Sequence, residues 1–114
     1  MSLPYTDNVT LLDAVAADGN SAGFDVSKRQ QITVEFIAAS GDSTFSIDAS
    51  NDGTNWISGI AFLDATATAT GTYVTSKVLS SAKGGAIVKP GWRFLRVTVD
   101  WTSGTATAIL QCGG

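Results

Sequence analysis

Apolar and polar residues alternate with a period of two along four stretches of the chain, which are residues 31–38, 44–50, 92–101 and 105–111. In the first stretch, Ile32, Val34 and Phe36 fall on one face and Thr33 and Glu35 on the other. A period of two is typical of a β-strand with one buried face. The pattern therefore predicts four strands, with the apolar residues of each facing a common core.

Weaker strand patterns cover residues 9–16, 22–26, 55–62 and 72–78, and turn-forming dipeptides such as Asp52-Gly53 and Ser103-Gly104 separate the runs. Residues 65–71 alternate small side chains and fit either a strand or a loop, whereas residues 80–85 read as a flexible loop. The pattern predicts an all-β chain of about eight short strands. Such spacing indicates a single antiparallel β-sandwich, of either jelly-roll or immunoglobulin-like strand order.

Short turns between neighbouring runs predict three hairpins. The expected pairs are 31–38 with 44–50, 44–50 with 55–62, and 92–101 with 105–111. The first pair would also bring Glu35 and Asp48 onto adjacent strands. Residues 1–8 precede the strands and are expected to form an N-terminal arm, and residues 9–114 the sandwich domain.

The composition supports this interpretation and narrows the chemistry. A chain of 114 residues with 44% hydrophobic and 15% charged residues fits one small globular domain. It has no histidine, which excludes a Ser-His-Asp triad or an imidazole metal site within the chain. We therefore expect no enzymatic activity and no cofactor. Cys112 is the single cysteine, and we expect a small core or edge residue, with an intermolecular disulfide as the alternative.

Charge and hydropathy also limit the partners. The net charge is −3 and the seven Lys and Arg residues are scattered, whereas nucleic-acid binders carry a basic stripe. No apolar run approaches the roughly 18 residues of a membrane span. The sequence thus predicts neither nucleic-acid nor membrane binding. The first residues lack the charged-then-apolar profile of a signal peptide, so we expect synthesis in a cytoplasm without a cleaved signal.

The segment from Asp48 to Trp56 allows three interpretations. Asp48, Ser50 and Asp52, with Gly53 next, match the start of an EF-hand calcium loop, but Gly59 stands where a bidentate Glu belongs. The segment also resembles the Asp-box turn of sialidases, one residue short. The third interpretation is a hairpin turn in which Asp-Gly supplies a positive φ. The turn is the favoured interpretation.

Aromatic side chains suggest a carbohydrate-binding alternative. Trp56, Tyr73 and Trp92 could together form a platform on which sugar rings stack. The competing interpretation is that these rings fill the core or a protein interface, as tryptophans in small domains commonly do.

The block FSIDASNDGTNWISG and the later block GWRFLRVTVDWTSGTATAILQC, which together fall within residues 30–112, resemble small β-sandwich proteins of tailed bacteriophage virions. The shared layout is a strand, an S-x-DG-x-x-W turn, an aromatic-Arg-Val strand and a Thr-Ser-Gly turn before a closing strand. The resemblance implies a structural protein of the virion, assembled in the host cytoplasm.

Within that class we expect a capsid decoration or cement protein, bound to the major capsid protein outside the head and acting by mechanical reinforcement. It would be a homo-oligomer that uses symmetry and many copies. Leu3, Pro4 and Tyr5 of the arm are the expected capsid contacts. The alternatives are a tail, neck or fibre-associated virion protein and a carbohydrate-binding β-sandwich module.

Overall fold

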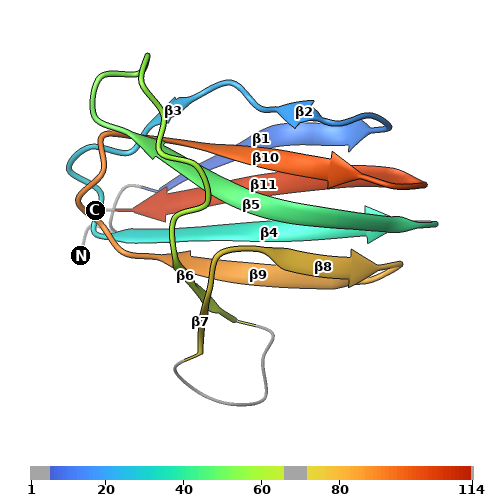
Figure 1. The fold of residues 1–114 in the computed structure, drawn as a ribbon. Helices are drawn as coiled ribbons and strands as arrows, with labels where there is room; N and C mark the ends of the chain where they lie inside the picture. Colours follow the sequence, from blue (N-terminus) through green and yellow to red (C-terminus); the bar gives the residue numbers. More distant parts are fainter. Residues whose placement is uncertain (1–5, 66–71, 114) are drawn as a thin grey trace.

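A computed structural model describes residues 6–65 and 72–113, in which every regular element is a β-strand. The strands form two antiparallel sheets packed face to face (Figure 1). The six-stranded sheet has the order β1 (Thr6–Val15), β11 (Thr105–Gly113), β4 (Gln31–Ala39), β9 (Lys83–Val88), β6 (Phe62–Asp64), β7 (Tyr73–Val74). The second sheet has the order β2 (Gly19–Asn20), β10 (Phe94–Trp101), β5 (Asp42–Ser50), β8 (Lys77–Ser80), and β3 (Phe24–Asp25) also pairs with β10.

The predicted all-β sandwich is confirmed, with eleven strands in the described residues where about eight were expected. The alternation also holds, because strand β4 buries Ile32, Val34 and Phe36 and exposes Thr33 and Glu35. No described segment forms a helix, so none could cross a membrane as one.

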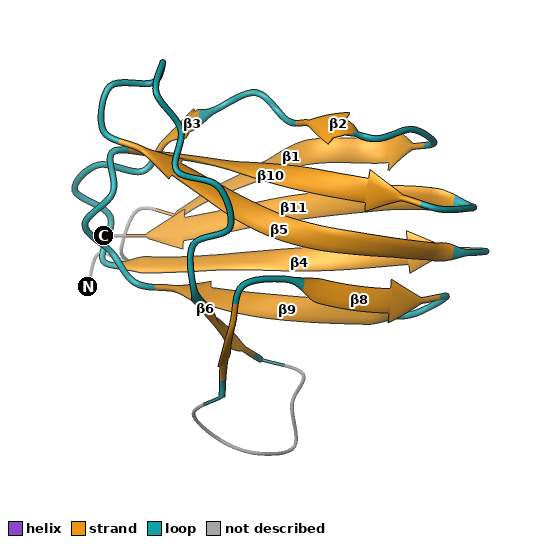
Figure 2. Cartoon of the chain, in the orientation of Figure 1, coloured by secondary structure: helices purple, strands orange, loops and turns teal. Residues whose placement is uncertain are grey.

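Four connections at one end of the molecule pass from one sheet to the other (Figure 2). They join β1 to β2, β4 to β5, β8 to β9 and β10 to β11, so the chain arches over the core at each of them. The first four strands of the larger sheet, β1-β11-β4-β9, therefore match β2-β10-β5-β8 of the smaller sheet one for one. Each strand faces its own neighbour in the sequence instead of bonding to it.

These arches correct two of the predicted hairpins. Strand β4 bonds to β11 and β9, and β5 bonds to β10 and β8, so the pairing of 31–38 with 44–50 is wrong. For the same reason 92–101 does not pair with 105–111, and Glu35 and Asp48 lie in different sheets. The predicted pairing of 44–50 with 55–62 is present only as a bridge between Ala49 and Ile57, followed by a hydrogen bond from the Ile60 amide to the Ile47 carbonyl.

The remaining differences concern weak patterns. Residues 55–61 form a loop rather than a strand, and 72–78 divides into β7 and β8, which lie in different sheets. Residues 80–85 were predicted to be a loop but contain the start of β9, which pairs with β4. Gly84 and Gly85, which are typical of loops, lie within this strand. Residues 66–71 lie outside the described part of the chain. Residues 6–8, assigned to the arm, belong to β1 and pair with residues 111–113.

The core lies between the two sheets. Phe36 stacks on Phe45 across the interface with ring centroids 4.9 Å apart, and Phe62 meets Phe36 edge to face at 5.9 Å. All three side chains are fully buried. Such aromatic contacts add about 0.5–1.5 kcal/mol per pair beyond area burial, which helps hold the sheets in register.

The end of the molecule that carries the four arches, called the arch end below, is closed by hydrogen bonds between two turns. The Ser103 hydroxyl accepts the Asp42 amide at 3.1 Å, and the Thr102 and Ser103 amides donate to the Asp42 carbonyl. Gly104 has a φ of +72°, and a Cβ there would overlap the Ala39 carbonyl oxygen. Only glycine fits this position without strain. The opposite end carries longer loops, and Trp56 and Trp92 lie there.

Candidate ligand-binding hollow at the Trp56 loop

The turn after β5 is built by two side chains, Ser50 and Asp52. Asp52 Oδ1 accepts hydrogen bonds from the Asn55 and Thr54 amides, both at 2.8 Å, and Oδ2 accepts one from the Asn55 side chain at 2.7 Å. The Ser50 hydroxyl donates to Asp52 and accepts the Gly53 amide. The backbone bonds from Asn55 and Thr54 are the main reason that the pKa of Asp52 lies well below its ordinary value of 3.8.

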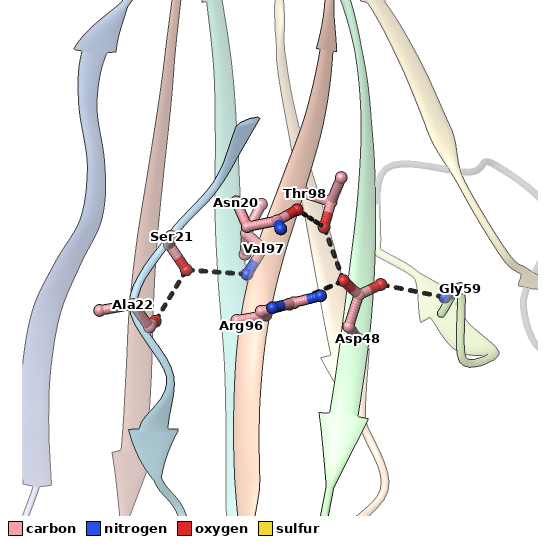
Figure 3. Close-up of polar contacts among 8 residues, drawn as sticks. All are labelled: Asn20, Ser21, Ala22, Asp48, Gly59, Arg96, Val97 and Thr98. Carbon is pink, nitrogen blue, oxygen red and sulfur yellow. Dashed lines mark hydrogen bonds and ion pairs between the residues drawn. The ribbon is translucent and has the colours of Figure 1, made fainter. Parts of the chain in front are cut away.

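Asp48 fixes the far part of the same loop to the smaller sheet (Figure 3). Its carboxylate accepts Arg96 Nε at 3.0 Å and the Thr98 hydroxyl at 2.6 Å from the adjacent strand β10, and the Gly59 amide at 3.1 Å from the loop. The side chain of Asp48 is only 4% exposed. A buried carboxylate needs such partners to offset its lost hydration, so this group anchors the loop.

Arg96 in turn supports Trp56. The guanidinium carbon lies 4.4 Å from the centroid of the indole ring, which is the geometry of a cation–π contact. The edge of the ring packs on Gly23, where an added Cβ would lie 2.8 Å from the indole. Trp56 is thus held from two sides by residues distant in the sequence.

A hollow of about 250 Å³ opens beside this indole. It is lined by two indole rings, an exposed apolar side chain and four polar residues: Trp56, Trp92, Ile57, Ser50, Asn51, Asp52 and Asn55. Its walls come from the loop after β5 and from Trp92 just before β10. An aromatic wall with convergent amide and carboxylate groups can hold a ligand that has both an apolar face and hydroxyl groups.

Tyr73 does not join the two tryptophans. It lies on β7 in the larger sheet and lines a separate hollow of about 420 Å³ with Leu63, Ile87 and Lys89. The Lys89 ammonium lies 5.4 Å from the centroid of the Tyr73 ring. Two of the three predicted platform residues therefore come together, and the third stands alone.

The three candidate calcium ligands are placed within these networks. Asp48 and Ser50 both lie on β5, with Asp48 bound to Arg96, while the Ser50 hydroxyl and Asp52 close the turn. In the described residues no group of three or more acidic or cysteine side chains is arranged to hold a metal. The hairpin turn, which the sequence favoured over calcium binding, agrees with the observed geometry.

Two other predicted sites can be located only in part. Cys112 is buried on β11, and burial raises the pKa of its thiol. Leu3, Pro4 and Tyr5 lie outside the described residues, and the strand that follows them, β1, forms one edge of the larger sheet. The contacts of these three residues stay predictions, and an intermolecular disulfide stays the untested alternative for Cys112.

Sequence reasoning missed Arg96, Asn51, Asn55 and Ile57. Arg96 counted only as one of seven scattered cations, yet it links Asp48 to Trp56. A signal was present, because Arg96 and Asp48 each occupy the polar face of a predicted strand. Using that signal requires knowing that β5 and β10 are neighbours, and the predicted hairpins had excluded this pairing.

Comparison with known proteins finds the fold in two prophage proteins. The crystal structure of the SPBc2 prophage-derived protein YomS superposes with a TM-score of 0.81 and 13% identity, over 100% of this chain and 97% of that one. The PBSX exported protein XepA gives a TM-score of 0.83 and 11% identity, over 100% of this chain and 39% of that one. This chain is thus a sandwich of the kind that spans YomS, and it corresponds to part of XepA.

Sequence comparison adds no closer relative. No protein-family model matches the chain, and no curated protein matches it significantly. At these identities the comparison shows a common fold and nothing beyond it.

Proposed function

We propose that this protein is a non-enzymatic structural component of a tailed-phage virion, with its place on the outside of the head as a decoration protein. The observation that carries the proposal is the correspondence of fold over the whole chain with a prophage-derived protein of nearly the same length. The sequence layout pointed to the same class from different evidence, the order of turn and strand motifs.

The strand order supports a further assignment, to the jelly-roll type rather than the immunoglobulin-like type. The chain alternates between two four-stranded layers, β1-β11-β4-β9 and β2-β10-β5-β8, through arches at one end. Jelly rolls, which contain eight strands in two sheets, recur in viral capsid and lectin domains. The assignment is therefore compatible with both a virion role and a glycan-binding role.

Surface chemistry supports a protein partner, which we propose to be the major capsid protein. The outer face of the two central strands β4 and β11 carries a single charge, Glu35, among Thr, Ile and Gln residues. The short, branched Thr and Ile side chains lose less side-chain entropy on docking than long flexible side chains do. At the arch end Asp13, Asp18, Asp42 and Asp100 are exposed, which discourages contact with packaged nucleic acid.

Assembly as a homo-oligomer, with Leu3, Pro4 and Tyr5 reaching the capsid, completes the proposal. Repeated weak contacts through many copies give high avidity without a large interface on each copy. A tail, neck or fibre position is the main alternative, because the same surface could bind any repeated virion protein.

The test is to locate the protein on purified particles. An antibody to this chain, used for immunogold microscopy and for blots of separated heads and tails, should label heads evenly. Label confined to tails or fibres would overturn the head position and keep the virion role. Label in the culture fluid alone, with none on particles, would overturn the virion proposal. A capsid-protein antibody serves as the positive control for heads.

A further inference from the structure

We propose that the hollow beside Trp56 binds one neutral sugar residue of a glycan, a role additional to the structural one. The hollow is lined by two tryptophans together with two asparagines, a serine and an aspartate. Pyranose rings present C–H groups on their faces and hydroxyls at their rims. This site matches both features, since the indoles can take the face and the polar groups the rim.

Contacts within the chain hold Trp56 in place without a ligand. Asp48 holds Arg96, Arg96 stacks on Trp56, and Gly23 contacts the edge of the same indole. A side chain fixed in advance loses little entropy when a ligand binds. Trp56 can therefore serve as a stacking surface for a sugar ring, and Asp48 and Arg96 are the residues that position it.

The polar groups are equally fixed. Four hydrogen bonds from within the turn orient the Asp52 carboxylate, and Asn55 is tied to it through its amide nitrogen. That bond leaves the amide oxygen of Asn55 as an acceptor for a sugar hydroxyl, and Asn51 adds a second amide to the lining. Asp52 brings a negative charge to the hollow, which favours a neutral sugar over an acidic one.

The size of the hollow sets the expected affinity. A volume of about 250 Å³ lies below the roughly 300–1,000 Å³ of sites for drug-sized ligands, so it suits one ring of a longer chain. Ile57, 55% exposed at the rim, would extend the apolar contact. Single-site binding is expected near the millimolar range, and multiple copies would raise the avidity.

Tryptophan fluorescence tests the proposal. The full-length protein is titrated with glucose, galactose, mannose, N-acetylglucosamine and their short oligomers. At least one neutral sugar should give a saturable change in the wild type. Trp56→Ala should weaken that binding about tenfold or more. Because this variant could unfold, Asn51→Ala is the second variant, and heteronuclear NMR follows binding when an indole is missing.

Matched controls come from the other aromatic residues. Trp101→Phe, at the arch end, and Tyr73→Phe, in the separate hollow, should both bind the sugar as the wild type does. The absence of saturable binding across the panel would overturn the proposal. So would a response that survives in folded Trp56→Ala and Asn51→Ala, or one lost only in Tyr73→Phe. None of these results would contradict the virion role, so the sugar-binding proposal and the virion proposal can be overturned independently.

Discussion

At the scale of single residues, the buried carboxylate of Asp48 holds three parts of the chain together. It connects two neighbouring strands and a loop through Arg96, Thr98 and Gly59. Removing one partner of a buried ion pair leaves the other charge without compensation, at a cost of roughly 3–5 kcal/mol. The side chain of Arg96 is 21% exposed, which places the expected cost at the low end of that range.

Asp48→Ala should therefore lower the free energy of unfolding by about 3 kcal/mol, measured by urea denaturation. Asp100→Ala is the matched control, because Asp100 is an exposed aspartate on the strand that carries Arg96. The control should change stability by less than about 0.5 kcal/mol. Equal effects of the two substitutions would contradict the anchoring role of Asp48.

The turn carboxylate Asp52 makes stability depend on pH. Its pKa is lowered in the folded protein, so its contribution is present above the ordinary value of 3.8 and is lost as the pH falls below it. Between pH 6 and pH 2, the melting temperature of the wild type should fall further than that of Asp52→Asn. Thermal melts of both proteins across that range measure the difference, and parallel curves would refute the assignment.

At the scale of elements, the four strongly alternating strands were predictable and their partners were not. Alternation identified β4, β5, β10 and β11 and their buried faces, because burial of one face imposes a period of two. A turn such as Ser40-Gly41 or Ser103-Gly104 supplies a positive φ for a hairpin and for an arch alike. The sequence therefore does not reveal whether the next strand bonds beside the last one or faces it.

The same ambiguity explains the incomplete prediction of the site. Trp56 and Trp92 meet because β5 and β10 are neighbours, so that their ends and the adjoining loop converge. Tyr73 follows a strand pattern too, but β7 belongs to the other sheet. The residue types for sugar stacking could be read from the chain, whereas their grouping required the topology.

The arch glycines allow a direct test of the crossing connections. Gly104→Ala adds a Cβ at a φ of +72° against the Ala39 carbonyl. Left-handed backbone costs a non-glycine residue roughly 1–3 kcal/mol, and the overlap adds to this. A large drop in melting temperature is expected. Gly19→Ala, where a Cβ meets nothing within 4 Å, should melt close to the wild type; similar losses in both would count against close contact of the arches.

The arm and the first strand can be separated by truncation. Residues 6–8 pair with β11, and Asp7 forms an ion pair with Arg29. Deleting residues 2–5 should keep the melting temperature and reduce occupancy on heads, whereas deleting 2–8 should also lower stability. Quantitative blots of particles and thermal melts provide the two measurements. If the protein still occupies heads fully after deletion of residues 2–5, Leu3, Pro4 and Tyr5 are not the capsid contacts.

At the scale of the whole molecule, Cys112 reports on global opening. The residue is 1% exposed between the sheets, and burial raises the pKa of its thiol, so both access and reactivity are low in the folded state. A thiol reagent should modify Cys112 at a rate that follows unfolding by urea. Rapid modification without denaturant would show that β11 separates locally from its neighbours.

The pairing of β1 with β11 has a consequence for biosynthesis. The first strand of the chain bonds to the last, with Thr6 opposite Gly113, and β11 also joins β1 to β4. Until β11 leaves the ribosome, β1 lacks the strand it bonds to and is not joined to β4. Contacts this distant in sequence make folding slow. The larger sheet therefore cannot be completed before β11 has been made, and a nascent chain arrested before residue 105 cannot hold the native structure.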